Sequence, residues 1–193
     1  LGLYHFLSAI DKEATVIVPD ALPDNLLFLP GAKDILIYSR YTDFANELIQ
    51  KADLIFCLDF NALKRIDMME LAIKNAGAKK IMVDPEISST CELVFRLICR
   101  MGMFDDLNVQ CATAIYTGMM TDTGNFTYNS NKSDIYFIIE ELVKKGIDKD
   151  KIYAKVCNTN SVDKLRLNGY AVSQKMEIFP EYRAAMISLT REE

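Results

Sequence analysis

The chain alternates short, almost entirely apolar runs with longer amphipathic runs, and this alternation constrains its fold more than any other feature. The apolar runs have the length of strands and lie at 15–19, 35–38, 54–58 and 80–83. Strands that are covered on both faces by helices, as in parallel sheets, are apolar along their whole length rather than at every second residue. The sequence therefore predicts an α/β fold, an open and mostly parallel sheet with helices on both faces.

Amphipathic periodicity and capping residues predict the helices. Between the strands we expect helices at 43–51 and 62–76, the second closed by Gly77. Ser89 and Glu92 form a capping box that predicts the start of a further helix. The remaining helices are expected at 1–7, 107–120, 133–145, 149–156 and 162–179.

The pattern changes after residue 160 and predicts two unequal parts. We expect one domain at 1–160, a connector helix at 161–180 and the start of a second α/β lobe at 181–193. A single strand cannot form a domain, and the first residue is Leu1 rather than methionine. We therefore expect the chain to be part of a longer protein.

The composition of the chain limits the kinds of ligand and the cellular location that we expect. The formal net charge of −5 disfavours a protein that tracks long nucleic acid, so small phosphorylated ligands are the better expectation. The five cysteines include no CxxC pair, which is typical of free thiols in a reducing compartment and predicts a cytoplasmic protein. No run approaches the roughly 18 apolar residues of a membrane span, and no signal peptide is evident, so we expect no membrane role.

Two aspartates end apolar strands: Asp59 follows 54–58, and Asp84 follows 80–83. In open α/β sheets ligands bind outside the carboxyl ends of the strands, so both acids are expected there. An aspartate in this place can also cap the next helix, but Asn61 is the better capping residue after the first strand. Asp59 is therefore a candidate for chemistry rather than for capping.

A third aspartate, Asp122, follows the helix expected at 107–120. The carboxyl end of a helix carries partial negative charge, so a carboxylate there is unfavourable by about 0.3–1 kcal/mol unless a cation compensates. A polar turn with Gly124 at positive φ is the alternative interpretation, and the local sequence by itself favours it. Three converging carboxylates would raise one another's pKa values, and bound Mg²⁺ or Mn²⁺ would relieve this repulsion.

Other phosphate-binding motifs are absent from the sequence. There is no GxxxxGK[ST] loop and no GxGxxG after a strand, so neither a P-loop nor a dinucleotide-binding domain is supported. The run 88–90 at a helix start, Ser-Ser-Thr, could bind phosphate, although Ser89 can equally serve only as the cap.

The order of these motifs resembles that of the DHH phosphoesterases, in particular the oligoribonuclease and phosphoadenosine-phosphate phosphatase branch related to the RecJ exonucleases. The resemblance rests on four runs, which are 58–61, 81–84, 88–94 and 118–126. The last run, Gly-Met-Met-Thr-Asp-Thr-Gly-Asn-Phe, is the most specific, because the family has a nearly identical G-x-x-x-D-T-G-x-F element. The chain departs from the family where Pro85, not two histidines, follows Asp84, and the family's first metal motif would precede Leu1. We interpret both as segments missing from the chain as given.

The resemblance implies a two-metal phosphoesterase. It implies that Asp59 bridges two Mn²⁺ ions, with Mg²⁺ or Co²⁺ as poorer substitutes, that Asp122 binds one of them, and that Asp84 supports the site. Further contacts to phosphate or to the metal ligands are implied for Asn61, Ser89, Thr90 and Asn125.

The substrates implied are short RNA oligonucleotides and 3′-phosphoadenosine 5′-phosphate, not long duplex nucleic acid, and a homodimer is left open. Cyclic-dinucleotide phosphodiesterase and pyrophosphatase or polyphosphatase activities remain alternatives within the superfamily. A nucleotide-sensing protein with a degenerate metal site is the non-enzymatic alternative.

Overall fold

The computed structural model describes residues 1–60, 62–83 and 89–191, and in this part of the chain the strands pair as three two-stranded sheets. Strand β1 (Ile17–Val18) pairs in parallel with β2 (Leu36–Ile37), and β3 (Leu54–Leu58) pairs in parallel with β4 (Lys79–Val83). Asp84 and Asn61 lie outside the described residues, so the structure does not place either of these predicted site residues.

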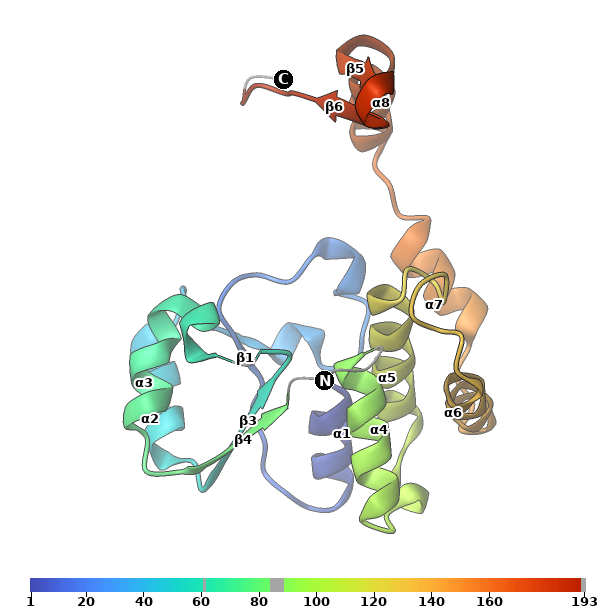
Figure 1. Cartoon of the computed structure of the whole chain (residues 1–193). Coiled ribbons are helices and arrows are strands. Elements are labelled where there is room, and N and C mark those ends of the chain that lie inside the picture. Colours follow the sequence, from blue (N-terminus) through green and yellow to red (C-terminus); the bar gives the residue numbers. More distant parts are fainter. Residues whose placement is uncertain (61, 84–88, 192–193) are drawn as a thin grey trace.

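Helices cover both sides of the parallel strands, as the sequence predicts (Figure 1). Helices α2 (Thr42–Lys51) and α3 (Glu70–Asn75) lie on one side, and α1 (Gly2–Ala9) and α4 (Thr90–Arg100) lie on the other. Strand β3 separates the two cores through its alternating side chains. Ile55 and Cys57 pack with the α2–α3 side, whereas Phe56 and Leu58 pack against the core that contains α1 and α4. The predicted α/β class is confirmed.

The four parallel strands form two separate ladders rather than one continuous sheet within the described residues. Strands β1 and β2 are only two residues long, so they offer few backbone groups for further pairing. Ile17 and Leu36 nevertheless contact the same core as Ile55, so side-chain packing holds the two ladders together.

The bounds of the next three helices differ from those predicted from the sequence by only a few residues. Helix α5 is longer at its carboxyl end than expected and includes Asp122, which is its last residue. The three helices are α5 (Val109–Asp122), α6 (Ser133–Lys144) and α7 (Lys149–Cys157). Gly146 follows α6 at φ +92°, which is the left-handed conformation that commonly ends a helix.

The helix predicted at 62–76 begins instead as a 3₁₀ segment at Leu63–Met69 and becomes α-helical only at Glu70–Asn75. Gly77 takes the predicted position directly after the capping residue Ala76, but it does not adopt the left-handed conformation that commonly ends a helix. Ala76 is already extended at φ −64° and ψ 138°, because the chain turns directly into β4.

The predicted helix at 162–179 is also wrong at its carboxyl end. Helix α8 (Val162–Tyr170) continues as a π-helical turn to Lys175, and the next four residues form β5 (Met176–Phe179). Strand β5 pairs antiparallel with β6 (Ala184–Ile187), so backbone hydrogen bonds between the strands replace those that a longer helix would make. Figure 1 shows this unit projecting from the rest on the stretch after α7. The division into domains stays a prediction.

No helix in the described ranges is both long and apolar enough to span a membrane.

Helices α4 and α5 approach each other closely at Gly118. A Cβ atom at this position would overlap the Cys91 sulfur and lie 3.1 Å from the Cys91 Cβ. The sulfur of Cys91 therefore occupies the space that any larger residue at position 118 would need.

We predict that Gly118→Ala lowers the free energy of unfolding by about 1–3 kcal/mol, because the added methyl overpacks this contact. Adding Cys91→Ala removes the sulfur and should recover most of the loss, as measured by urea unfolding of the single and double variants.

Gly169→Ala in α8 is the matched control, since no atom lies within 4 Å of a Cβ there. In this helix the alanine should be neutral or stabilising by up to about 1 kcal/mol. Equal effects at positions 118 and 169 would show that the α4–α5 contact tolerates a methyl group.

Candidate metal centre

Asp59 lies directly after β3 in an unusual backbone conformation. Its amide donates a hydrogen bond to the carbonyl of Val83 at 2.8 Å, which extends the β3–β4 ladder by one residue. Its φ of +69° is in the left-handed region, which aspartate and asparagine tolerate better than most other residues. The side chain is exposed at the carboxyl end of the strand, where the sequence predicts a ligand site.

Asp122 is the last residue of α5, and a tightly bonded turn follows it. Thr123 is fully buried, donates from Oγ1 to the carbonyl of Met119 at 2.6 Å, and accepts from the amide of Phe126 at 2.9 Å. Gly124 has φ +55° and Asn125 has φ +58°. The polar-turn interpretation is confirmed at Gly124, and it is compatible with a functional Asp122 at the start of the turn.

The first residues of α4 join the two aspartates. Ser89 donates from Oγ to Oδ2 of Asp122 at 2.6 Å, and Thr90 donates from Oγ1 to Oδ1 of Asp59 at 2.9 Å. Both hydroxyl-bearing residues are buried, at 3% and 7% exposure. Ser89 also caps α4, as predicted, since its Oγ accepts from the amide of Cys91 at 3.1 Å. The structure thus brings together four of the site residues named from the sequence, Asp59, Asp122, Ser89 and Thr90, and their roles stay predictions.

The environment of Asp122 makes its charged form less favourable. Partial burial of the Asp122 carboxyl raises its pKa, the negative charge of Asp59 raises it further, and the hydrogen bond from Ser89 opposes both. A raised pKa means that the anionic form is unfavourable in the folded protein, so this carboxyl weakens the fold as the pH rises above the ordinary aspartate range. A bound cation would reverse this effect.

Cys91 lies beside these acids, and its thiol stays protonated at neutral pH in the metal-free protein. Burial of its thiol, followed by the charge of Asp122, raises the pKa of Cys91 to about 11. The thiolate, which is the reactive and metal-binding form, is therefore scarce at neutral pH. The role of Cys91 in this structure is its contact with Gly118.

The chemistry of the donor set fits a hard divalent cation. Carboxylate oxygens are the ligands that Mn²⁺ and Mg²⁺ prefer. The carboxylates of Asp59 and Asp122 supply such oxygens, and both are negatively charged when ionised. Asp59 and Asp122 supply only part of a coordination shell, and no group of three or more metal-binding side chains occurs among the described residues. The only histidine of the sequence, His5, contacts the carbonyl of Pro30 from Nε2 at 2.9 Å, so its ring serves packing and a backbone contact.

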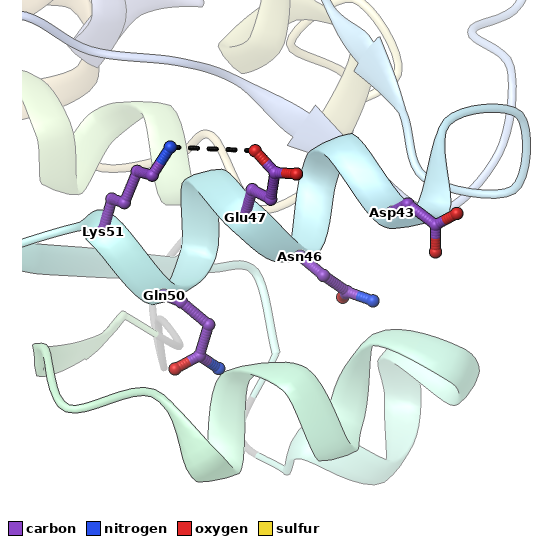
Figure 2. A pocket seen from close by; sticks show the side chains of 5 residues that line it. All are labelled: Asp43, Asn46, Glu47, Gln50 and Lys51. Carbon is purple, nitrogen blue, oxygen red and sulfur yellow. Dashed lines mark ion pairs between the residues drawn. The ribbon is translucent and has the colours of Figure 1, made fainter.

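A surface depression of about 480 Å³ lies elsewhere, along α2 (Figure 2). The side chains that line it all come from this one helix, and Glu47 and Lys51, one turn apart, form an ion pair of 3.7 Å. The lining residues are Asp43, Asn46, Glu47, Gln50 and Lys51. None of the site residues predicted from the sequence takes part in it.

The sequence of the chain is similar to those of several known proteins. No family model matches the chain. It is 29% identical over 157 residues to the bifunctional oligoribonuclease and PAP phosphatase NrnA of Thermus thermophilus, a match that covers 76% of this chain and 45% of that protein. An uncharacterized Mycoplasma pneumoniae protein is 31% identical over 74 residues, or 38% of this chain and 22% of that protein.

A solved structure gives a closer match. The crystal structure of an exopolyphosphatase-related protein from Bacteroides fragilis superposes with a TM-score of 0.97 at 57% identity, over 100% of this chain and 61% of that one. These similarities support membership of the DHH-like superfamily. They do not distinguish its branches, and the chain spans less than half of its curated relatives and less than two thirds of the solved structure.

Sequence reasoning missed how the four residues are connected. It assigned Ser89 and Thr90 to phosphate or ligand contacts without seeing that each hydroxyl bonds a different aspartate. Asn125 lies in the turn after Asp122 with an exposed side chain, and its role stays a prediction.

We predict that Asp59→Asn leaves the stability of the metal-free protein unchanged or slightly raised. Asparagine tolerates the left-handed backbone, can still accept the hydrogen bond from Thr90, and removes the charge that opposes Asp122. Asp59→Ala should instead lose about 1 kcal/mol or more, because alanine is strained in this conformation. Thermal unfolding in the presence of a chelator compares the two variants, and a drop of many degrees for Asp59→Asn would show that the carboxylate itself is structural.

Proposed function

We propose that this protein is a metal-dependent phosphoester hydrolase of the DHH-like superfamily that acts on short oligoribonucleotides and 3′-phosphoadenosine 5′-phosphate. The observation that carries the proposal is the pair of carboxylates, Asp59 after β3 and Asp122 at the end of α5, each of which accepts a hydrogen bond from a hydroxyl at the start of α4. The similarity to a protein named as an oligoribonuclease and PAP phosphatase supports the substrate class.

A second candidate is hydrolysis of inorganic polyphosphate. The specific observation in its favour is the 57% identity to a protein described as exopolyphosphatase-related. Both reactions break a bond between phosphorus and oxygen, so the same pair of carboxylates serves either one. The substrate therefore has to be decided by the rest of the pocket.

Asp59 and Asp122 would hold two Mn²⁺ ions, with Asp84 as a third expected ligand. When bound, the ions supply Lewis-acid stabilisation of the phosphoryl oxygens and lower the pKa of water. Asp59, fixed by its backbone bond to Val83, offers its carboxylate at the end of a rigid strand. Asp122 offers the second carboxylate from the end of a buried helix, so neither group depends on a long flexible side chain.

We propose a cytoplasmic location on the basis of the cysteines, which are all free thiols in the structure.

We predict that the full-length protein loses its phosphodiesterase activity after chelation and regains it with Mn²⁺, and less with Mg²⁺ or Co²⁺. Asp59→Asn should abolish activity at every metal concentration while the protein stays folded. Hydrolysis of a labelled dinucleotide, together with circular dichroism of the variant, checks both statements. Full activity after exhaustive chelation would contradict the proposal. Tight nucleotide binding without hydrolysis would favour the alternative, a nucleotide-sensing protein with a degenerate metal site.

We further predict that a dinucleotide is cleaved far faster than a thirty-residue RNA. With a net charge of −5 the chain offers no extended basic track for a long strand, so few counterions are released on binding and salt should have little effect. Turnover of both RNAs at low and moderate salt is compared with phosphate release from polyphosphate. Equal rates on the two RNAs would contradict the proposal, and a preference for polyphosphate would select the second candidate.

A further inference from the structure

We infer that Ser89 and Thr90 are positioning residues that orient Asp122 and Asp59 for metal binding, rather than groups that contact the substrate. This inference rests on the proposed function, because it concerns the same metal centre. It assigns separate tasks to neighbouring residues: Ser89 holds the carboxylate from α5, and Thr90 holds the carboxylate that follows β3.

The hydroxyl of Ser89 has its hydrogen-bonding capacity committed within the protein. A serine hydroxyl has one proton to donate, and that proton points to Oδ2 of Asp122 at 2.6 Å. The same oxygen accepts from the amide of Cys91 at 3.1 Å. Since only 3% of Ser89 is exposed, a phosphate in solvent has little access to it.

Thr90 provides the stronger evidence, because helix capping does not explain its contact. Ser89 is the capping residue of α4, and Thr90 is the first residue inside the helix. Its hydroxyl nevertheless donates to Oδ1 of Asp59 at 2.9 Å, across to the end of another element. Asp59 has a left-handed backbone at that point, so its side-chain direction is set by two constraints, the backbone and Thr90.

Together the two bonds fix the carboxylates relative to each other. Ser89 and Thr90 are consecutive residues at the start of α4, so the aspartates are hydrogen-bonded to neighbouring points of one backbone. Each bond uses one carboxylate oxygen and leaves the second oxygen, Oδ2 of Asp59 and Oδ1 of Asp122, outside that bond. Hydrogen bonds that orient metal-binding carboxylates in this way commonly contribute substantially to metal affinity.

The test measures Mn²⁺ binding rather than activity alone. Full-length, metal-stripped protein is titrated with Mn²⁺ by calorimetry, and the bound ion is followed by electron paramagnetic resonance. Thr90→Val keeps the shape of the side chain and removes its hydroxyl, so we expect about 10- to 100-fold weaker Mn²⁺ binding and an altered resonance spectrum. Thr90→Ser retains the hydroxyl and should restore both.

Two matched controls separate positioning from helix stability. Thr42 is the first residue of α2 and donates to the carbonyl of Tyr38, so Thr42→Val removes an equivalent hydroxyl away from the site. Ser161 caps α8 through its Oγ, so Ser161→Ala removes a cap without a carboxylate bond. Neither control should change Mn²⁺ affinity, whereas Ser89→Ala should weaken it as Thr90→Val does.

The outcomes distinguish this inference from the proposed function. A wild-type protein that binds no Mn²⁺ would overturn the proposed function and, with it, the inference. Wild-type binding that Thr90→Val and Ser89→Ala leave unchanged would overturn the inference alone. So would a higher KM for the dinucleotide at unchanged Mn²⁺ affinity, because that result would make Thr90 a substrate contact. Should Thr90→Val fail to fold, Thr90→Ala takes its place, and retained Mn²⁺ affinity in that variant would count equally against the inference.

Discussion

The close packing of α4 against α5 is the constraint on which the candidate site depends. Gly118 faces Cys91, and the space between the helices has no room for a larger residue at position 118. This contact brings the first turn of α4 to the last turn of α5, where Ser89 meets Asp122. Helices that approach less closely would separate these two side chains, and a short hydrogen bond between them would not form.

The second constraint is β3, which places Asp59 at the boundary of the two cores. Its alternating side chains pack on both sides, so the strand cannot shift by one residue without moving buried groups to the wrong core. Asp59 follows in a left-handed conformation that its backbone bond to Val83 holds in place. Backbone strain of this kind persists only where the surrounding structure fixes it, and it is often found at functional sites.

The same arrangement places the carboxyl of Asp122 where its negative charge is unfavourable. Partial burial and the charge of Asp59 both raise the pKa of Asp122, so the anionic form of Asp122 is unfavourable in the metal-free protein. The hydroxyls of Ser89 and Thr90 offset part of this repulsion by donating hydrogen bonds. In the proposed metal centre, a divalent cation would relieve the remaining part of this repulsion.

The sequence by itself determined the α/β class, most helices and the positions of Asp59 and Asp122, because apolar periodicity and the placement of acids at element ends are local signals. It failed at 63–69, which form a 3₁₀ segment, and at 176–179, where antiparallel pairing with β6 replaces the expected helix. Tertiary structure alone decided that Ser89 bonds Asp122 and Thr90 bonds Asp59. These contacts join residues more than thirty positions apart, and only the packing of three separate elements brings them within hydrogen-bonding distance.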